Sequence, residues 1–232
     1  MIPYKDDNPT SSFPFVTIGL IALNIAAYMW QMGSPKGGQE IAFSYGAIPY
    51  NLLTLHMSQP LHPVMTIFTS MFLHGGLFHL GGNMLYLWIF GNNIEDRLGP
   101  LRFLVFYLLS GVIAAYAHAF VEPVSRIPMI GASGAVSGVL GAYLLLFPHA
   151  RVYTIIFLGF FLQIVRVPAL IVIGFWAIIQ IVNGVIAKGL MNQGGVAWFA
   201  HIGGFLFGLF TVRLWIWGRS RQIRNTFTLS YL

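Results

Sequence analysis

Two short stretches of the sequence could together form a nucleophilic serine site. Residues 131–134, Gly-Ala-Ser-Gly, place one hydroxyl among residues with little or no side chain. Residues 200–208 carry His201 in a second apolar run that is also rich in glycine. A serine becomes nucleophilic when a neighbouring base takes its proton, which needs the hydroxyl and the imidazole at about 2.6–3.2 Å. Ser133 and His201 therefore predict nucleophilic catalysis, provided that the fold brings the two runs together.

The spacing of glycines offers a way to bring the runs together. In the first run, Gly134 and Gly138 share one face of a helix. In the second run, His201, Gly204 and Gly208 share a face at i, i+3 and i+7. Membrane helices with such small-residue faces can approach each other closely. The serine-bearing stretch taken alone is equally typical of plain helix packing, so the chemistry depends on the pair.

A third polar cluster precedes these runs. His79 and Asn83 lie four residues apart and project from one helical face, and His74 comes just before them. Polar side chains at membrane depth face a cavity or a partner, because hydrocarbon does not solvate them. Three roles are open: hydrogen bonds between helices, metal binding, or donors to a developing oxyanion. The sequence lacks an HExxH motif and a nearby carboxylate, so we expect no metal and no cofactor.

The composition indicates an all-α membrane protein. Of the 232 residues, 57% are hydrophobic and only 8% are charged, whereas soluble domains have about a quarter charged residues. Apolar runs long enough to cross about 30 Å of hydrocarbon recur, and the short alternating segments of a transmembrane barrel are missing. We expect the lipid bilayer as a partner. Because no basic patch is interleaved with aromatic residues, we expect no nucleic-acid partner.

Six transmembrane helices are expected in a single domain that covers residues 13–217. The expected spans are at about 13–32, 78–93, 101–120, 133–147, 168–186 and 198–217. Residues 1–12 are expected to form a polar tail that ends in a helix cap at Ser11 or Ser12. The segment 151–167 is apolar, but it is short for a span and bounded by arginines. We expect a loop or an interfacial segment there.

An even number of spans places both termini on one side of the membrane. On this layout most of the 12 basic residues lie on the side of the termini, so the tails 1–12 and 218–232 are expected in the cytoplasm. Ser133 follows an outer loop, and His201 begins the last span, which runs inward. Both residues are therefore expected at the same depth, toward the outer side.

Acidic residues are absent from all six expected spans. This argues against an aspartyl protease, which needs two carboxylates, and against a transporter with a carboxylate proton relay. It also leaves His201 without an acidic partner, so a nucleophilic Ser133 would act in a Ser/His dyad. Ser137, one turn further along, is expected to pack or to bond the His201 ring.

In order, spacing and expected topology, the chain resembles the rhomboid intramembrane serine proteases of the minimal six-helix bacterial type. The motifs that carry the resemblance are His74-x4-His79-x3-Asn83, Gly131-Ala132-Ser133-Gly134 and Ala200-His201-x2-Gly204-x3-Gly208. The resemblance implies a six-transmembrane-helix rhomboid-like bundle, multi-pass in a bacterial inner membrane. It also implies an endopeptidase that cuts transmembrane or juxtamembrane segments of membrane-protein substrates.

The same resemblance implies a role for each residue of the dyad and its surroundings. Ser133 would be the nucleophile and His201 the general base. The backbone N–H of Ser133 and the side chains of His79 and Asn83 would hold the oxyanion. Gly131 would belong to the substrate-facing loop.

Two further implications concern the edges of the site. His74 would support a water-filled cavity, and residues 188–196 would form a cap over it. Some family members carry an aromatic residue where this chain has Ser137, so the group that orients His201 is left open. The alternative function is a catalytically silent rhomboid-like module that binds membrane proteins. Its usual mark is the loss of the serine or the histidine.

Overall fold

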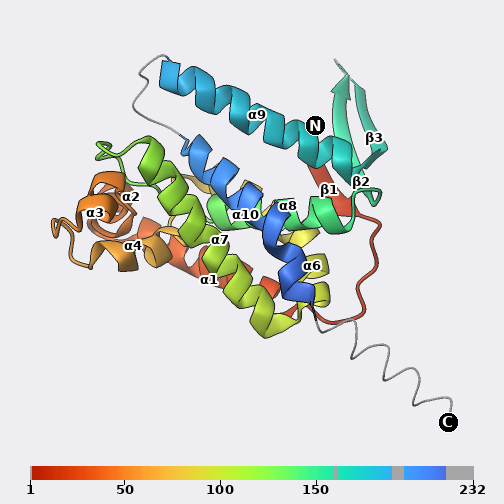
Figure 1. Cartoon of the computed structure of the whole chain (residues 1–232), viewed down its shortest axis with the longest axis horizontal. Helices are drawn as coiled ribbons and strands as arrows, with labels where there is room; N and C mark the ends of the chain where they lie inside the picture. The colour runs from red at the N-terminus through yellow and green to blue at the C-terminus, as the bar shows by residue number, and fades with distance from the viewer. Residues whose placement is uncertain (1, 159–160, 190–195, 218–232) are drawn as a thin grey trace, which may run out of the picture.

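The computed structural model describes residues 2–158, 161–189 and 196–217, and most of these residues are helical (Figure 1). Four helices are long and apolar enough to cross a membrane: α1 (Phe15–Gly33), α7 (Pro100–Val121), α9 (Ala169–Gly189) and α10 (Trp198–Ile216). The helix α8 (Ser133–Leu146) is apolar but has only 14 residues. The chain is therefore a multi-pass membrane protein.

The segment expected to span at 78–93 is helical but irregular. It consists of α5 (Leu77–Tyr86), a short π-helix η1 (Leu87–Gly91) and α6 (Asn92–Leu98). All six expected spans thus coincide with helices. Among the described residues, length and composition identify the four long helices as membrane-crossing.

Three short helices fill the connection between α1 and α5. They are α2 (Gly37–Tyr45), α3 (Pro49–Thr54) and α4 (Pro63–Ser70), and they lie together at one end of the molecule (Figure 1, left). An isolated bridge pairs Ala47 with Met129, so the connection holds the loop that leads into α8. This loop borders the candidate site.

The expectation of an all-α fold is wrong in one respect, because the chain also contains an antiparallel sheet. Its strands are β1 (Ile2–Asp6), β2 (Arg151–Leu158) and β3 (Phe161–Pro168), in the order β1-β2-β3. The expected tail 1–12 therefore contains a strand, and 151–167 is a hairpin rather than a loop. The segment 151–167 is rich in β-branched and aromatic residues, which favour strands. Pairing of its two strands satisfies the backbone N–H and C=O groups close to an apolar environment.

The helix cap expected at Ser11 or Ser12 is also wrong, because α1 is capped from another part of the chain. Its first-turn N–H groups, from Val16 and Thr17, donate to the carboxylate of Glu95 at 2.9 and 2.7 Å. Glu95 is only 1% exposed. The two serines instead donate hydrogen bonds to the adjacent carboxylate of α6. A negative group at a helix N-terminus accepts hydrogen bonds from the free backbone N–H groups and also interacts favourably with the positive end of the helix dipole.

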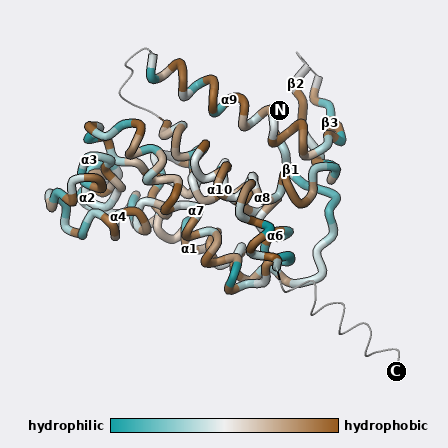
Figure 2. Tube along the Cα trace, viewed as in Figure 1, coloured by the Kyte–Doolittle hydropathy of each residue, from teal (hydrophilic) through white to brown (hydrophobic). Residues whose placement is uncertain are grey.

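The helices α7, α8 and α10 form the centre of the bundle, and α8 and α10 cross at glycines. A Cβ added at Gly208 would lie 1.8 Å from the carbonyl oxygen of Gly138, and one at Gly141 would lie 2.1 Å from that of Phe205. At such distances the facing backbones leave no room for a side chain. Figure 2 shows apolar residues over most of α9, which lies at the outside, and polar residues along the segment after β1.

Candidate active site

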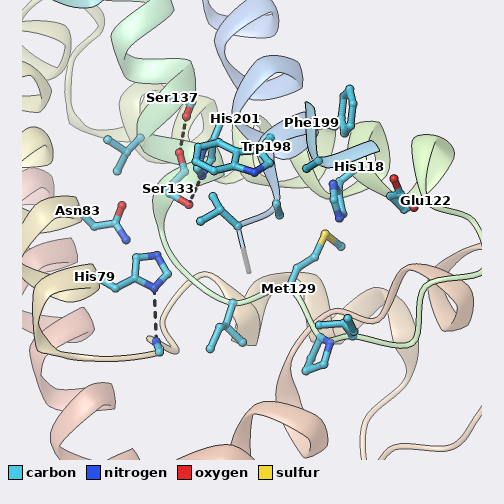
Figure 3. A pocket seen from close by; sticks show the side chains of 18 of the residues that line it. His79, Asn83, His118, Glu122, Met129, Ser133, Ser137, Trp198, Phe199 and His201 are labelled. Atoms are coloured by element: carbon cyan, nitrogen blue, oxygen red, sulfur yellow. Dashed lines mark hydrogen bonds between the residues drawn. The ribbon is translucent and has the colours of Figure 1, made fainter. Parts of the chain in front are cut away.

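Ser133 and His201 meet at the glycine crossing of α8 and α10. Ser133 is the first residue of α8, and His201 lies in the first turn of α10. Oγ of Ser133 is 2.8 Å from Nε2 of His201 (Figure 3). This distance allows direct proton transfer between the hydroxyl and the imidazole. Because Ser133 begins its helix, its backbone N–H has no acceptor within α8.

The other ring nitrogen of His201 contacts α9. Its Nδ1 lies 2.8 Å from Oε1 of Gln180, whose Nε2 donates to the carbonyl oxygen of Trp176 at 3.1 Å. The indoles of Trp176 and Trp198 flank the imidazole at centroid distances of 6.0 and 6.1 Å. Gln180 is a residue of the site that was not predicted from the sequence. An amide in an otherwise apolar run was the available signal, because such a group needs a partner at membrane depth.

His79 and Asn83 project from α5 toward the same part of the cavity as Ser133 (Figure 3). Nδ1 of His79 accepts a hydrogen bond from the N–H of Gly75 at 3.4 Å. In the neutral ring the proton then resides on Nε2, which is a donor. Nδ2 of Asn83 is buried, and it has no hydrogen-bond partner among the described residues. Two side-chain donors therefore stand near the serine hydroxyl with capacity to bind an acceptor.

Gly131 holds the loop before α8 against His79. Its φ is +122°, a value that residues with a side chain rarely adopt. Its N–H donates to the carbonyl oxygen of Ser70 at 2.8 Å. A Cβ at this position would lie 2.7 Å from both Cε1 and Nε2 of His79. The backbone geometry and the close imidazole both require glycine here.

The two residues expected to support the site are both fully buried. His74 is fully buried behind His79, with ring centroids 5.1 Å apart, and is not part of the cavity wall. The side chain of Gln31 bonds both the N–H and the carbonyl oxygen of His74, at 3.0 and 2.9 Å. The hydroxyl of Ser137 donates to the carbonyl oxygen of Ser133 at 2.6 Å, so of the two expected roles the side chain packs within α8 and does not bond His201.

These groups surround a cavity of about 860 Å³. Its polar lining comprises His79, Asn83, His118, Glu122, Ser125, Ser133, Ser137, Lys188 and His201. His118 and Glu122 come from the end of α7, farther along the cavity from the serine (Figure 3), and no site prediction named them. Most of the cap expected at 188–196 falls on residues 190–195, outside the described residues.

The described residues contain no group of three His, Asp or Glu side chains that could hold a metal ion. What the cavity brings together is a hydroxyl, an imidazole and neutral hydrogen-bond donors. These are the components of acyl transfer through a serine nucleophile.

Comparison with known proteins places the chain in one family. The family profile described as Rhomboid domain matches residues 62–218. Over 196 residues the chain is 30% identical to Rhomboid protein 1, mitochondrial, of Saccharomyces cerevisiae. The aligned region covers 82% of this chain and 50% of the yeast protein. Over 207 residues it is 26% identical to Rhomboid protease GluP of Bacillus subtilis, covering 89% of this chain and 35% of that protein.

A third relative carries a different description. The chain is 42% identical over 84 residues to Inactive RHOMBOID-like protein 8 of Arabidopsis thaliana, covering 36% of this chain and 23% of that protein. The chain spans half or less of the length of these relatives. The profile match extends over more than half of the chain and contains all three sequence motifs. The chain therefore belongs to the rhomboid family.

Proposed function

We propose that the chain is an intramembrane serine endopeptidase that cuts transmembrane or juxtamembrane segments of membrane proteins. The observation that carries the proposal is the 2.8 Å contact between Oγ of Ser133 and Nε2 of His201. The contact borders a cavity large enough for a stretch of peptide. Membership of a family that includes a protein named rhomboid protease supports the same function.

The proposed reaction begins with proton transfer from the hydroxyl of Ser133 to Nε2 of His201 as Oγ attacks the peptide carbonyl carbon. The carbonyl oxygen becomes an oxyanion, which accepts hydrogen bonds from the N–H of Ser133 and the side chains of His79 and Asn83. The imidazolium of His201 then gives its proton to the leaving amine, and the C–N bond breaks. The product is an acyl ester on Ser133.

Hydrolysis completes the proposed cycle. His201 takes a proton from a water molecule, and the resulting hydroxide attacks the ester carbonyl carbon. The proton returns to Oγ of Ser133 as the C–O bond breaks, which releases the new carboxyl terminus. Each step uses groups of this chain and water alone, so the proposed mechanism needs no metal and no cofactor.

In the proposed arrangement, residues 13–217 form six spans in a bacterial inner membrane, with the tails 1–12 and 218–232 in the cytoplasm and the site toward the outer side. Two observations support the placement of the tails and the site at opposite ends of the molecule. The strand β1 and the last turns of α10 lie at the same end of the molecule, opposite α2, α3 and α4 (Figure 1). The loop at 124–130 that lines the cavity lies at the end with these three helices.

The second candidate function is a catalytically silent module that binds membrane proteins. The match to a relative named inactive is the observation that favours it. The presence of both Ser133 and His201 at bonding distance favours the protease instead, since a silent module has no need of an activated hydroxyl.

Covalent labelling with a fluorophosphonate probe tests the proposal. The purified protein in detergent should be labelled, because the probe reacts with a serine whose proton is taken by a base. Labelling should disappear in Ser133→Ala and fall by about 100-fold or more in His201→Ala. The control Ser34→Ala, at a half-buried position outside the cavity lining, should label normally. Labelling that persists in Ser133→Ala would refute the site. Cleavage of a transmembrane model substrate in the presence of chelator should follow the same pattern.

A further inference from the structure

We propose that Gln180 is a positioning residue that holds His201 in the tautomer with the proton on Nδ1, an inference that rests on the proposed protease function. The amide lies in the middle of α9, is 5% exposed and has its Oε1 2.8 Å from Nδ1 of His201. The serine and the glutamine therefore contact opposite nitrogens of one imidazole.

The orientation of the amide follows from its second contact. Nε2 of Gln180 lies 3.1 Å from the carbonyl oxygen of Trp176, and a carbonyl oxygen can only accept a hydrogen bond. The nitrogen end of the amide must therefore point to Trp176, which leaves the oxygen end for His201. Since Oε1 can only accept, Nδ1 of His201 must carry the proton.

This assignment determines what Nε2 of His201 can do. In a neutral imidazole with its proton on Nδ1, Nε2 has a lone pair and accepts from the hydroxyl of Ser133. The opposite tautomer would direct an N–H at the hydroxyl and could not take its proton. Gln180 thus fills the place that a carboxylate holds in soluble serine proteases, and the triad is Ser133, His201 and Gln180.

An amide suits this depth because it is neutral. An isolated carboxylate would lose its hydration in the membrane core, which costs far more than the transfer of an amide with both ends bonded. The other titratable groups around His201 are His79 from α5 and His118 from α7, which are also neutral in their unprotonated form. The position of α9 relative to α10 therefore controls the orientation of the base.

Paired variants test the role of Gln180. Gln180→Leu keeps the approximate volume but removes the acceptor, and it should lower kcat about 10- to 100-fold with KM within about twofold. In its protonated, neutral form Gln180→Glu keeps an oxygen acceptor for Nδ1 of His201 and an O–H donor for the carbonyl oxygen of Trp176, so it should recover most of that loss. Asn183→Leu, an amide replacement one turn further along α9, is the control and should cleave at the normal rate. Normal kcat in Gln180→Leu, or equal losses in the Leu and Glu variants, would overturn the proposal.

A readout that does not depend on activity separates this inference from the proposed function. The ¹⁵N shifts of the His201 ring in histidine-labelled protein report which nitrogen carries the proton. The unsubstituted chain should show the proton on Nδ1, and Gln180→Leu should show a mixture of tautomers. A proton on Nε2 in the unsubstituted chain would overturn the inference even if the protein cleaves. Failure of the unsubstituted chain to cleave or label, with the proton on Nδ1, would contradict only the protease proposal.

Discussion

The polar residues around Ser133 combine one acceptor with several donors. Nε2 of His201 is placed to accept the hydroxyl proton, whereas Nδ2 of Asn83 and Nε2 of His79 can only donate in the tautomer described above. Donors aimed at one point favour negative charge that develops there. Because no carboxylate lies among them, the arrangement avoids burying a charge until the reaction creates one.

Gly131→Ala is expected to impair the site without unfolding the protein. The added Cβ would lie 2.7 Å from the His79 ring, and the φ of +122° is strained for alanine, so the imidazole or the loop must shift. We expect kcat to fall about 10-fold or more, with a loss of stability of about 1–3 kcal/mol. Cleavage kinetics and thermal unfolding measure the two effects. Gly81→Ala, on α5 with open space around its Cβ, is the control; equal kcat in both variants would contradict the steric argument.

At the scale of the elements, the meeting of α8 and α10 decides whether the catalytic pair forms at all. The two helices carry Ser133 and His201 in their first turns, and their backbones touch at glycines further along. Any increase in the separation of the helices lengthens the contact between the hydroxyl and the imidazole. Activity and packing are therefore coupled through the crossing.

Gly208→Ala should separate α8 from α10. Its Cβ would lie 1.8 Å from the carbonyl oxygen of Gly138, and a backbone atom cannot rotate away. We expect a loss of stability of at least about 1–3 kcal/mol from overpacking and a loss of fluorophosphonate labelling. Gly19→Ala, on α1 with nothing near its Cβ, should be neutral or slightly stabilising. Thermal unfolding measures the stability of both variants, and the probe measures their labelling. A stable, fully labelled Gly208→Ala protein would show that the crossing of α8 and α10 tolerates a side chain.

At the scale of the whole molecule, β1 joins the N-terminal segment to the centre of the bundle. Asp6 is 8% exposed, and its carboxylate accepts hydrogen bonds from the hydroxyl of Tyr143 at 2.5 Å and from Nδ2 of Asn93 at 3.0 Å. The first residues of the chain are thereby tied to α8, the helix that begins with Ser133.

The stability of this junction should depend on pH. Burial raises the pKa of the Asp6 carboxyl above its ordinary value of 3.8, and this outweighs the opposing hydrogen bond from Tyr143. The folded state therefore holds the proton more tightly than the unfolded state, so the contribution of Asp6 to stability falls as pH rises from about 4 through the raised pKa. Thermal unfolding across this interval should show the fall in the unsubstituted chain but not in Asp6→Asn. Asp7→Asn should keep a smaller fall, because the neighbouring charge of Asp7 also raises the pKa of Asp6. An unchanged pH slope in Asp6→Asn would contradict the assignment.

The proposed orientation in the membrane predicts which lysines face outward. The chain has no cysteine, so single substitutions can be labelled without background. In intact cells, a membrane-impermeant maleimide should label Lys36→Cys, at the end with α2, α3 and α4. It should label Lys5→Cys, in β1, only after permeabilisation. The reverse pattern would place the site toward the cytoplasm.

The helices were predictable because the signal for each lies within its own stretch of sequence. An apolar run of about 20 residues excludes most alternatives to a helix in a membrane, and all six expected spans coincide with helical segments. The sequence does not predict the pairing of β2 with β3, because a short apolar run is compatible with strand, loop or interfacial helix. The strand β1, which also pairs with β2, lies more than 140 residues away, as the pairing of Ile2 with Ile155 shows.

For the site, the sequence by itself determined the chemical types and their order: a serine between glycines, a histidine on a glycine-faced helix, and His79 with Asn83 on one helical face. These features follow from local composition and helical periodicity. Only the tertiary structure decided that Gln180 contacts His201, that Ser137 bonds the backbone of Ser133, and that the cap of α1 comes from Glu95. The physical reason is that a hydrogen bond between separate helices depends on how they pack, and no single stretch of sequence encodes that packing.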